Sequence, residues 1–357
     1  MKKTLIGIVV VIAVVLIIVI GSQNKNQSIK IGIVTPLSGD LAFWGEGTVL
    51  GAQMAVDDLK KKGIDVSVIA EDGGLDPKKA LDAGQKLLNV DGVQAMFPEF
   101  NPAAIALSSY LKDKNVLEIY DAAPFSPLSQ NLNALKTYID FKTGCKSVAQ
   151  YIRDKGVQKI GILEMNLEFS QLCTEGIGEV YDSSSLYKET YNAGDTDLRT
   201  QLVKIKQHDP DIIFNISLTP ENFVAIRNLE QVEIGDILYV GVADSFPTNL
   251  VEDYKSQMKN KIIFGLPPVS KEFIAKVTNA YPDKDIFAYE PVAIGYLHTM
   301  QIGEALNECK LDIVCAREEV GNSEPSNIIG FKGFTDRVAQ FDIQIQEWIG
   351  GEFVNVK

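Results

Sequence analysis

Metal-ligating side chains are scarce in this sequence of 357 residues. It holds two histidines, His208 and His298, and four cysteines, and no C-x-x-C pair brings cysteines together. The histidines form no ligand-spaced cluster with the cysteines, which argues against a zinc site. His208 lies in a polar loop before a strand pattern, and His298 lies among apolar helix residues. Neither has the surroundings expected of a catalytic base.

The common nucleotide-binding and hydrolase motifs are missing as well. The sequence contains no G-x-x-x-x-G-K-[ST], no G-x-S-x-G and no H-E-x-x-H. Residues 45–51, GEGTVLG, have the spacing G-x-G-x-x-x-G and stand far behind the preceding strand pattern, unlike a dinucleotide fingerprint. No nucleophile, base and orienting group occur together at a recognisable spacing. We therefore expect a binding protein without cofactor or metal rather than an enzyme.

Positive charge is also in short supply. The 34 Lys and Arg residues are outnumbered by 47 Asp and Glu residues, for a net charge of −13. This balance argues against nucleic acid or anionic lipid headgroups as the main partner, because both are bound through clustered basic side chains. A chain of this length is too long for one hydrophobic core and fits two lobes.

One long apolar run is present, at the N-terminus. Residues 5–20 are uninterrupted apolar positions that follow Lys2 and Lys3. A cleaved signal peptide and an uncleaved anchor are both consistent with this pattern. We favour an anchor over residues 1–22 followed by a tether over 23–28, because the run is long and no small-x-small cleavage site ends it. Either interpretation places the remaining chain outside the cytoplasm, at the membrane surface or in the periplasm.

The four cysteines fit that location. Outside the cytoplasm, an even number of cysteines favours disulfides. Cys309 and Cys315 enclose a short segment after a helical pattern, and Cys145 and Cys173 are the remaining pair. Buried free thiols are the alternative for both pairs.

Strand patterns alternate with amphipathic helical patterns through most of the chain. The first strand, from Ile29, leads into a loop with Phe43 and Trp44 and then into a helix. Asp76 and Asn101 each precede a proline and are predicted to be helix N-caps. This alternation predicts parallel sheets covered by helices on both faces. The other predicted strands are 66–70, 93–97, 116–120, 159–163, 212–217, 237–242 and 261–264.

Breaks in this alternation indicate where the chain passes between two lobes. They fall at 137–141, 265–268 and 330–333. Three crossings predict a clamshell that closes around a ligand. The predicted first lobe comprises 29–141 plus 266–330, and the predicted second lobe comprises 142–265 plus 331–357.

Several segments carry a family resemblance. GIVTPLSGDLAFWGEGTVLGAQMAVDDL (32–59), EDGGLDPKKALDAGQKLL (71–88) and VLEIYDAAPFSPL (116–128) resemble the leucine/isoleucine/valine-binding-protein family of ABC-transporter substrate-binding proteins. The ending GFKGFTDRVAQFDIQIQEWIGGEFVNV (330–356) is similar to the closing strands of that family. The resemblance implies a type I periplasmic-binding-protein fold of two doubly wound α/β lobes. It also implies that a small molecule is bound unchanged between the lobes. We expect ABC permease subunits as partners, and a monomer, because a monomer suits a clamshell.

The resemblance carries individual ligand-binding positions. Trp44 occupies the place of an aromatic residue that stacks on the ligand. Asn101 falls where a serine holds the ligand carboxylate, and Ala122 matches a backbone carbonyl that accepts from the ligand amine. Phe169 matches an aromatic residue of the second lobe, and Asp244 lies near an acidic residue that pairs with the amine.

Other positions depart from the family pattern. Pro124 falls where a threonine supplies a hydroxyl and an N–H, and proline has neither. Leu218 falls where a tyrosine often sits. As an N-cap, Asn101 would leave the N–H groups of Ala103 and Ala104 free for an anion. A ligand with a carboxylate is therefore still expected, whereas a standard branched-chain amino acid is less secure.

Each candidate also has a purely structural interpretation. Trp44 and Phe169 could pack in a core, and Asn101 and Asp244 could simply cap a helix or a turn. Tyr289, at the start of a long helical pattern, could line the cleft or pack at the helix start. The predicted function is an extracytoplasmic solute-binding protein for an amino acid or related small carboxylate. A membrane-tethered sensory domain of the same fold is the alternative.

Overall fold

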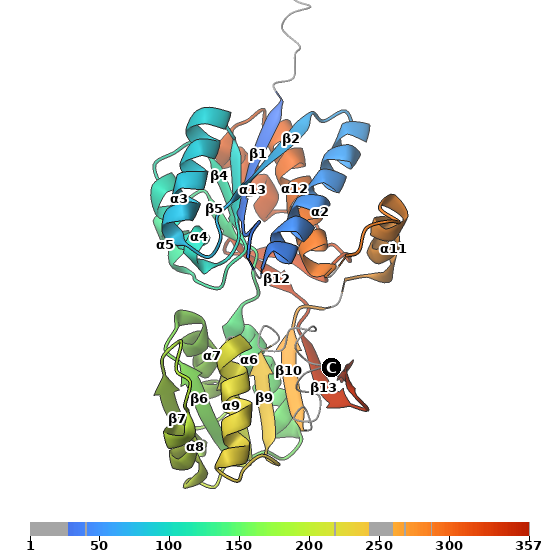
Figure 1. The fold of residues 1–357 in the computed structure, drawn as a ribbon. Helices are drawn as coiled ribbons and strands as arrows, with labels where there is room; N and C mark the ends of the chain where they lie inside the picture. Colours follow the sequence, from blue (N-terminus) through green and yellow to red (C-terminus); the bar gives the residue numbers. More distant parts are fainter. Residues whose placement is uncertain are drawn as a thin grey trace, which may run out of the picture.

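The computed structural model describes residues 28–39, 41–217, 219–242, 260–267, 269–286 and 288–356. These residues form two lobes, each built on a seven-stranded sheet with helices packed against it (Figure 1). The predicted N-terminal anchor, 1–22, lies outside the described residues. Within the described ranges, no helix combines the length and the apolar character needed to cross a bilayer.

The first sheet has the strand order β11-β12-β5-β4-β3-β1-β2. Neighbouring strands are parallel except β11 and β12, which form an antiparallel pair at one edge. Its inner strands are buried, as expected for a parallel sheet covered on both faces. The strands are β1 (Ile29–Thr35), β2 (Val66–Asp72), β3 (Ala95–Pro98), β4 (Leu117–Tyr120), β5 (Ala134–Lys136), β11 (Phe331–Thr335) and β12 (Val338–Phe341).

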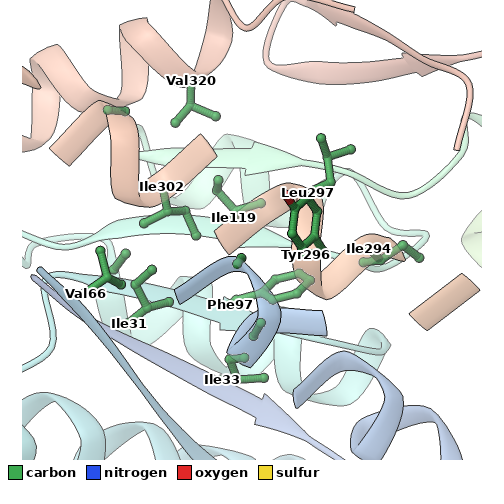
Figure 2. Packing of buried hydrophobic residues seen from close by; sticks show 14 of the residues in the cluster. Ile31, Ile33, Val66, Phe97, Ile119, Ile294, Tyr296, Leu297, Ile302 and Val320 are labelled. Atoms are coloured by element: carbon green, nitrogen blue, oxygen red, sulfur yellow. The ribbon is translucent and has the colours of Figure 1, made fainter. Parts of the chain in front are cut away.

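The helices of the first lobe cover both faces of this sheet. In Figure 2, Ile31, Phe97 and Ile119 of the strands face Ile302 and Leu297 of α12 across a buried core. The helices are α2 (Ala42–Lys61), α3 (Pro77–Lys86), the π-helical turn η1 (Leu87–Asp91), α4 (Asn101–Leu111), α5 (Ser126–Gln130), α11 (Lys271–Ala280), α12 (Glu290–Glu308) and α13 (Ile313–Gly321).

The second sheet repeats the winding of the first. Its order is β14-β13-β10-β9-β8-β6-β7, so β7-β6-β8-β9-β10 corresponds to β2-β1-β3-β4-β5. The pairs β10–β13 and β13–β14 are antiparallel, and the other pairs are parallel. The strands are β6 (Ile160–Met165), β7 (Leu186–Tyr191), β8 (Ile212–Ile216), β9 (Leu238–Val242), β10 (Lys261–Gly265), β13 (Gln344–Ile349) and β14 (Glu352–Asn355).

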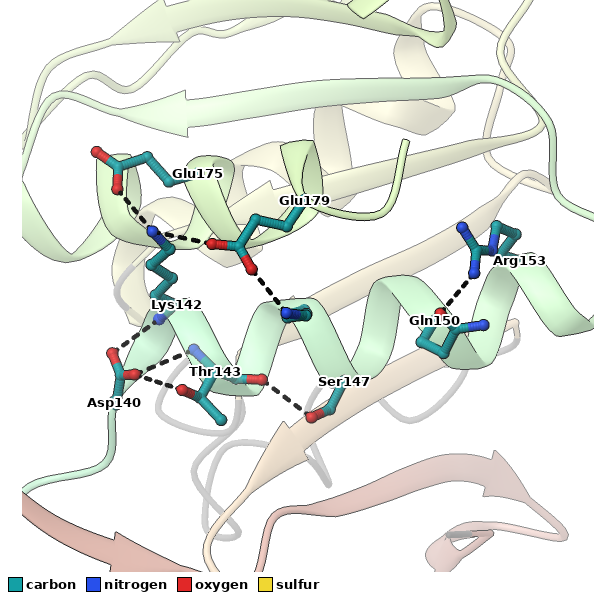
Figure 3. A network of polar contacts seen from close by, with 9 residues as sticks. Asp140, Lys142, Thr143, Ser147, Gln150, Arg153, Glu175 and Glu179 are labelled. Atoms are coloured by element: carbon teal, nitrogen blue, oxygen red, sulfur yellow. Dashed lines mark hydrogen bonds and ion pairs between the residues drawn. The ribbon is translucent and has the colours of Figure 1, made fainter. Parts of the chain in front are cut away.

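The helices of the second lobe are α6 (Phe141–Asp154), α7 (Glu168–Gly178), the 3₁₀ turn η2 (Ser183–Ser185), α8 (Arg199–Lys206) and α9 (Thr219–Gln231). Asp140 caps α6, its carboxylate accepting from the N–H groups of Lys142 and Thr143 at 3.1 and 3.3 Å. Lys142 then reaches Glu179 of the neighbouring helix region at 3.0 Å (Figure 3). The prediction of two doubly wound α/β lobes is confirmed.

Both predicted disulfides are present, and the free-thiol alternative is wrong. Cys145 of α6 is bonded to Cys173 of α7, inside the second lobe. Cys309, the C-cap of α12, is bonded to Cys315 in α13 of the first lobe. Each bridge joins two consecutive helices of one lobe.

The chain crosses between the sheets at 137–140, at 266–270 and at 342–343. The prediction that all of 331–357 belongs to the second lobe is wrong, because β11 and β12 pair in the first sheet. The glycine that suggested a crossing at 330 has another function. Gly330 has φ +65°, and a Cβ there would lie 2.3 Å from the Pro267 ring, so glycine lets the chain pass the second crossing.

Candidate functional site

The topology places the carboxyl ends of both sheets toward the crossings. The crossings leave the carboxyl ends of β5, β10 and β12, and β5 and β10 run parallel to the central strands of their own sheets. The loops that follow β3 and β4 therefore lie at the same inter-lobe edge as the loop that follows β6. Such edges are where open α/β sheets bind ligands.

Polar contacts join the lobes at this edge. The Phe125 N–H of the first lobe donates to the Glu168 carboxylate, at the start of α7, at 3.1 Å. Lys136, the last residue of β5, is fully buried and donates from Nζ to the carbonyls of Tyr138 at 2.7 Å and Ile139 at 3.2 Å in the first crossing. Burial lowers the pKa of Lys136 to about 8. Lys136 thus fixes the path of the crossing where it leaves the sheet.

Trp44 lies at the first-lobe side of this edge, in the first turn of α2. Its indole is half-buried and donates from Nε1 to Oε1 of Glu99 at 3.2 Å. Its ring meets the Phe100 ring edge to face, with 6.0 Å between centroids. The sequence therefore identified an aromatic residue that the fold brings to the predicted edge.

Glu99 is a residue that the sequence reasoning missed. It follows β3 directly, is 1% exposed, and forms a parallel bridge with Asp121 at the end of β4. Thr48 of α2 donates to the same Oε1 atom at 2.9 Å. Burial raises the pKa of Glu99 to about 8, and the charge of Asp121 adds to this shift. An acidic residue directly after the apolar strand pattern was the available signal.

Asn101 behaves differently from its prediction as an N-cap. Phe100 is the N-cap, with φ +66°, and the helix begins at Asn101 itself. The Asn101 Oδ1 accepts from the Ala123 N–H at 3.1 Å, and the Ala104 N–H donates to the Phe100 carbonyl at 3.0 Å. With Phe100 as the N-cap, the helix starts one residue earlier than predicted. Asn101 therefore ties α4 to the loop after β4, and the Ala104 N–H is not free for an anion.

The second lobe presents amides and hydroxyls near its own edge. Asn215 of β8 donates to Ser217 at 2.7 Å and to Asn222 of α9 at 3.2 Å, and all three side chains are buried. Glu221 accepts from the Gly194 N–H, after β7, at 2.9 Å. Among the described residues, no three His, Cys, Asp or Glu side chains are grouped closely enough to hold a metal ion.

The chain can now be compared with known proteins. Residues 28–323, more than half of the chain, match the family model described as "Periplasmic binding protein". The chain belongs to the periplasmic binding proteins. This confirms the resemblance drawn from the sequence motifs.

Curated relatives point the same way. The Leu/Ile/Val-binding protein BraC3 of Rhizobium johnstonii is 27% identical over 227 residues, which cover 58% of this chain and 59% of the relative. The Leu/Ile/Val-binding protein of Escherichia coli K12 is 24% identical over 207 residues, which cover 55% and 56%. The matched part thus spans less than two thirds of either relative.

Solved structures share the fold over nearly the whole chain. A leucine binding protein, LivK, from Thermotoga maritima has a TM-score of 0.76 at 15% identity, covering 92% of this chain and 98% of its own. LivJ from Streptococcus pneumoniae, in complex with isoleucine, has 0.74 at 20% identity, covering 92% and 100%. A solute-binding protein from R. palustris, in complex with 4-hydroxybenzoate, has 0.78 at 16% identity, covering 92% and 95%. At these identities the likeness shows the fold.

The remaining predicted ligand-binding residues of this periplasmic binding protein differ in their surroundings. Ala122 is buried in the loop that follows β4, in the first lobe. Tyr289 is half-buried and is the N-cap of α12. Phe169 is 4% exposed and packs on Phe141, with ring centroids 4.9 Å apart, in the core of the second lobe. Asp244 and Leu218 lie outside the described residues. Ligand contact at these positions stays a prediction.

Proposed function

We propose that this periplasmic binding protein is the solute-binding component of an ABC transporter and holds a small carboxylate-bearing molecule between its lobes. One observation carries the proposal: the three crossings leave the carboxyl ends of both sheets, so the loops at both edges face a shared inter-lobe region. Trp44 lies at this edge and supplies an aromatic surface there. The described residues show no group of metal ligands at which a hydrolytic metal could act.

The mechanism is closure of the lobes around the ligand. Short crossings allow one lobe to rotate toward the other, and Lys136 fixes the start of the first crossing to its sheet. A ligand favours the closed form only by its greater affinity for that form. The Phe125–Glu168 hydrogen bond joins the two lobes, so rotation of one lobe would change its geometry.

Two ligand classes merit direct comparison. The curated relatives are called Leu/Ile/Val-binding proteins, and a neighbour of known structure holds 4-hydroxybenzoate. Both classes carry a carboxylate and an apolar body. Pro124 removes an N–H donor from the first-lobe edge, and its carbonyl accepts from the Tyr120 hydroxyl at 3.0 Å. This arrangement leaves fewer first-lobe donors for an α-amino acid.

A thermal-shift screen of the full chain tests the proposal. Leucine, isoleucine, valine and 4-hydroxybenzoate are added separately, and a ligand at a hundredfold excess over Kd stabilises the folded state by about 2.7 kcal/mol. We expect a clear rise in Tm with one of these two classes. Trp44→Ala should then weaken binding at least tenfold. The matched control is Trp348→Ala, because Trp348 packs on Phe353 in the β13–β14 hairpin and leaves binding intact. A flat screen would contradict the proposed ligand class.

We also propose that residues 1–22 anchor the protein, as a monomer, on the outer face of the membrane beside its permease. The support is the apolar run 5–20 behind Lys2 and Lys3, together with two disulfides that fit an oxidising compartment. Alkaline washing of membranes from cells making the full chain should leave it in the pellet. Release into the wash would contradict the anchor.

A further inference from the structure

The first-lobe edge buries a carboxyl group directly beneath its aromatic residue. Glu99 is 1% exposed, and its Oε1 accepts from both the Trp44 indole and the Thr48 hydroxyl, two residues that lie one helical turn apart on α2. Burying a carboxyl group costs free energy even when hydrogen bonds partly offset it. Simple packing at this position would be served better by an apolar side chain.

The contacts of Glu99 connect the ends of several elements. Glu99 follows β3, the Trp44 and Thr48 donors come from α2, and Asp121 lies opposite Glu99 at the end of β4. The indole is therefore held by its hydrogen bond to Glu99 and by edge-to-face contact with the Phe100 ring. Trp44 packs against the first-lobe core but is only half-buried, so part of its side chain remains accessible to solvent.

We propose that Glu99 is a positioning residue that fixes the orientation of the Trp44 indole for ligand stacking and makes that orientation dependent on its own ionisation. The inference rests on the proposed function insofar as Trp44 contacts the ligand. An ionised acceptor holds an indole N–H more strongly than a neutral one does. The indole environment should therefore change as Glu99 loses its proton.

The charged and titratable groups around Glu99 define the pH range of this change. Asp121 faces it from the end of β4, and the groups that reach it from β1 and α2 are the uncharged Thr35, Thr48 and Trp44. Burial, with the nearby charge of Asp121, raises the pKa of Glu99 to about 8. Ionisation of Glu99 thus falls between pH 7 and pH 9.

Fluorescence of Trp44 measures this directly in the full chain. The chain contains two tryptophans, so Trp348→Phe leaves Trp44 as the only one. In this background we expect the emission to change between pH 6 and pH 9.5 with a midpoint near 8. Glu99→Gln keeps an acceptor oxygen for the indole but does not titrate, and it should abolish the transition. Glu118→Gln is the matched control, because Glu118 is also a fully buried carboxyl but is bonded to Ser108 and Asn131.

Acrylamide quenching at pH 7 separates positioning from packing. Glu99→Leu removes the acceptor and should raise the quenching constant of Trp44 about two- to threefold, whereas Glu99→Gln should restore the low value. A transition that persists in Glu99→Gln would overturn the proposal, and so would equal quenching in the Leu and parent proteins. If Glu99→Leu does not fold by circular dichroism, the pH profile of Glu99→Gln decides.

The binding readout links the inference to the ligand. With a compound that raises Tm in the screen, Glu99→Leu should increase Kd at least fivefold, and Glu118→Gln should leave Kd within twofold. An unchanged Kd in Glu99→Leu would overturn the role of Glu99 in binding. Because the fluorescence experiments need no ligand, a failed screen would contradict the proposed function without altering their outcome.

Discussion

The two lobes share one winding but bury different polar side chains on and after their central strands. The first lobe buries carboxyl groups on and after β3 and β4, namely Glu99, Glu118 and Asp121. The second lobe buries Asn215 and Asn222 at the corresponding place, bonded to one another. Carboxyl groups with raised pKa values ionise near neutral pH, whereas amides do not titrate in that range. Glu99 and Glu118 of the first lobe therefore ionise near neutral pH, whereas the Asn215–Asn222 pair of the second lobe does not titrate there.

The lobes also differ in how their disulfides constrain the chain. Cys145–Cys173 closes a sequence separation of 28 residues in the second lobe, and Cys309–Cys315 closes one of 6 in the first. Chain-entropy reasoning gives about 3.6 kcal/mol for the longer loop and about 2.2 kcal/mol for the shorter. Removing the second-lobe bridge with the double substitution Cys145→Ser and Cys173→Ser should be the most destabilising change considered.

Urea unfolding of the two double-serine variants checks this ranking. We expect the midpoint to fall further for the Cys145/Cys173 variant than for the Cys309/Cys315 variant. Once all three proteins are fully reduced, their midpoints should converge, because none of them then has a disulfide. Equal midpoints, or the reverse order, would show that loop length does not govern the effect here.

The sequence predicted strands with long apolar runs better than strands that are short or polar. Strands such as β8 and β9 were predicted within a residue of their observed bounds, because apolar runs buried on both faces give an unmistakable pattern. The short strand β5 and the half-exposed strand β7 carry weak patterns, and neither was predicted. Glycine at 330 gave a turn signal that was mistaken for a crossing, because its close approach to Pro267 is a tertiary contact.

The candidate site shows the same limit. Trp44 was predicted at the edge because it follows the first strand closely, although it lies in the first turn of α2 and not in the predicted loop. The partners of Asn101 could not, because the positive φ of Phe100 shifts the helix start and depends on packing around the loop. Glu99 was missed because burial of a carboxyl group is a property of the folded chain, set here by Trp44 and Thr48 on another element.

Replacing Glu118 should make the first lobe less sensitive to pH. Burial raises the pKa of Glu118 from 4.5 to about 7, so the folded chain keeps a proton that the unfolded chain loses between these values. The free energy of unfolding therefore decreases as the pH rises through this window. Glu118→Gln retains partners for Ser108 and Asn131 but removes the titration.

We expect the stability of the parent protein relative to Glu118→Gln to fall by about 3 kcal/mol between pH 4.5 and pH 7. Chemical unfolding at half-unit pH steps measures it. The contribution of His298, whose pKa burial lowers to about 4, is common to both proteins and cancels in the difference. A difference that is constant with pH would mean that folding does not raise the pKa of Glu118.

Two glycines of α7 differ in how closely other atoms pack against them: Gly176 faces α6, and Gly178 faces open space. A Cβ on Gly176 would lie 2.1 Å from the Lys142 carbonyl of α6, so Gly176→Ala must push the two helices apart. We expect it to lower the free energy of unfolding by about 2 kcal/mol. Gly178→Ala, at the end of the same helix, meets no atom within 4 Å and should stabilise by about 0.5 kcal/mol. Thermal melts of both variants test the contrast: Tm should fall in Gly176→Ala and rise in Gly178→Ala, and a change of the same sign in both would contradict the prediction.

Surface ion pairs can be compared through one lysine in each lobe, Lys276 in the first and Lys142 in the second. Their replacement should have the smallest effects on stability. Lys276 of α11 reaches Asp58 at 2.5 Å and the Tyr296 hydroxyl at 2.6 Å, and it lies 4.0 Å from the centre of the Tyr296 ring. Its hydrogen bond holds the pKa of Asp58 well below the usual range, against the opposing effect of burial. Part of this contact is packing, which salt does not screen.

Lys142 of the second lobe makes purely ionic surface contacts, with Glu179 at 3.0 Å and Glu175 at 3.5 Å (Figure 3). We expect Lys276→Met to cost about 1 kcal/mol and Lys142→Met about 0.3 kcal/mol in dilute buffer. In 1 M NaCl the Lys142 effect should vanish, because exposed charges are screened within about 3 Å, while part of the Lys276 effect should remain. Unfolding at both salt concentrations measures the four values. If both effects vanished together in salt, the contact of Lys276 with the Tyr296 ring would contribute nothing to stability.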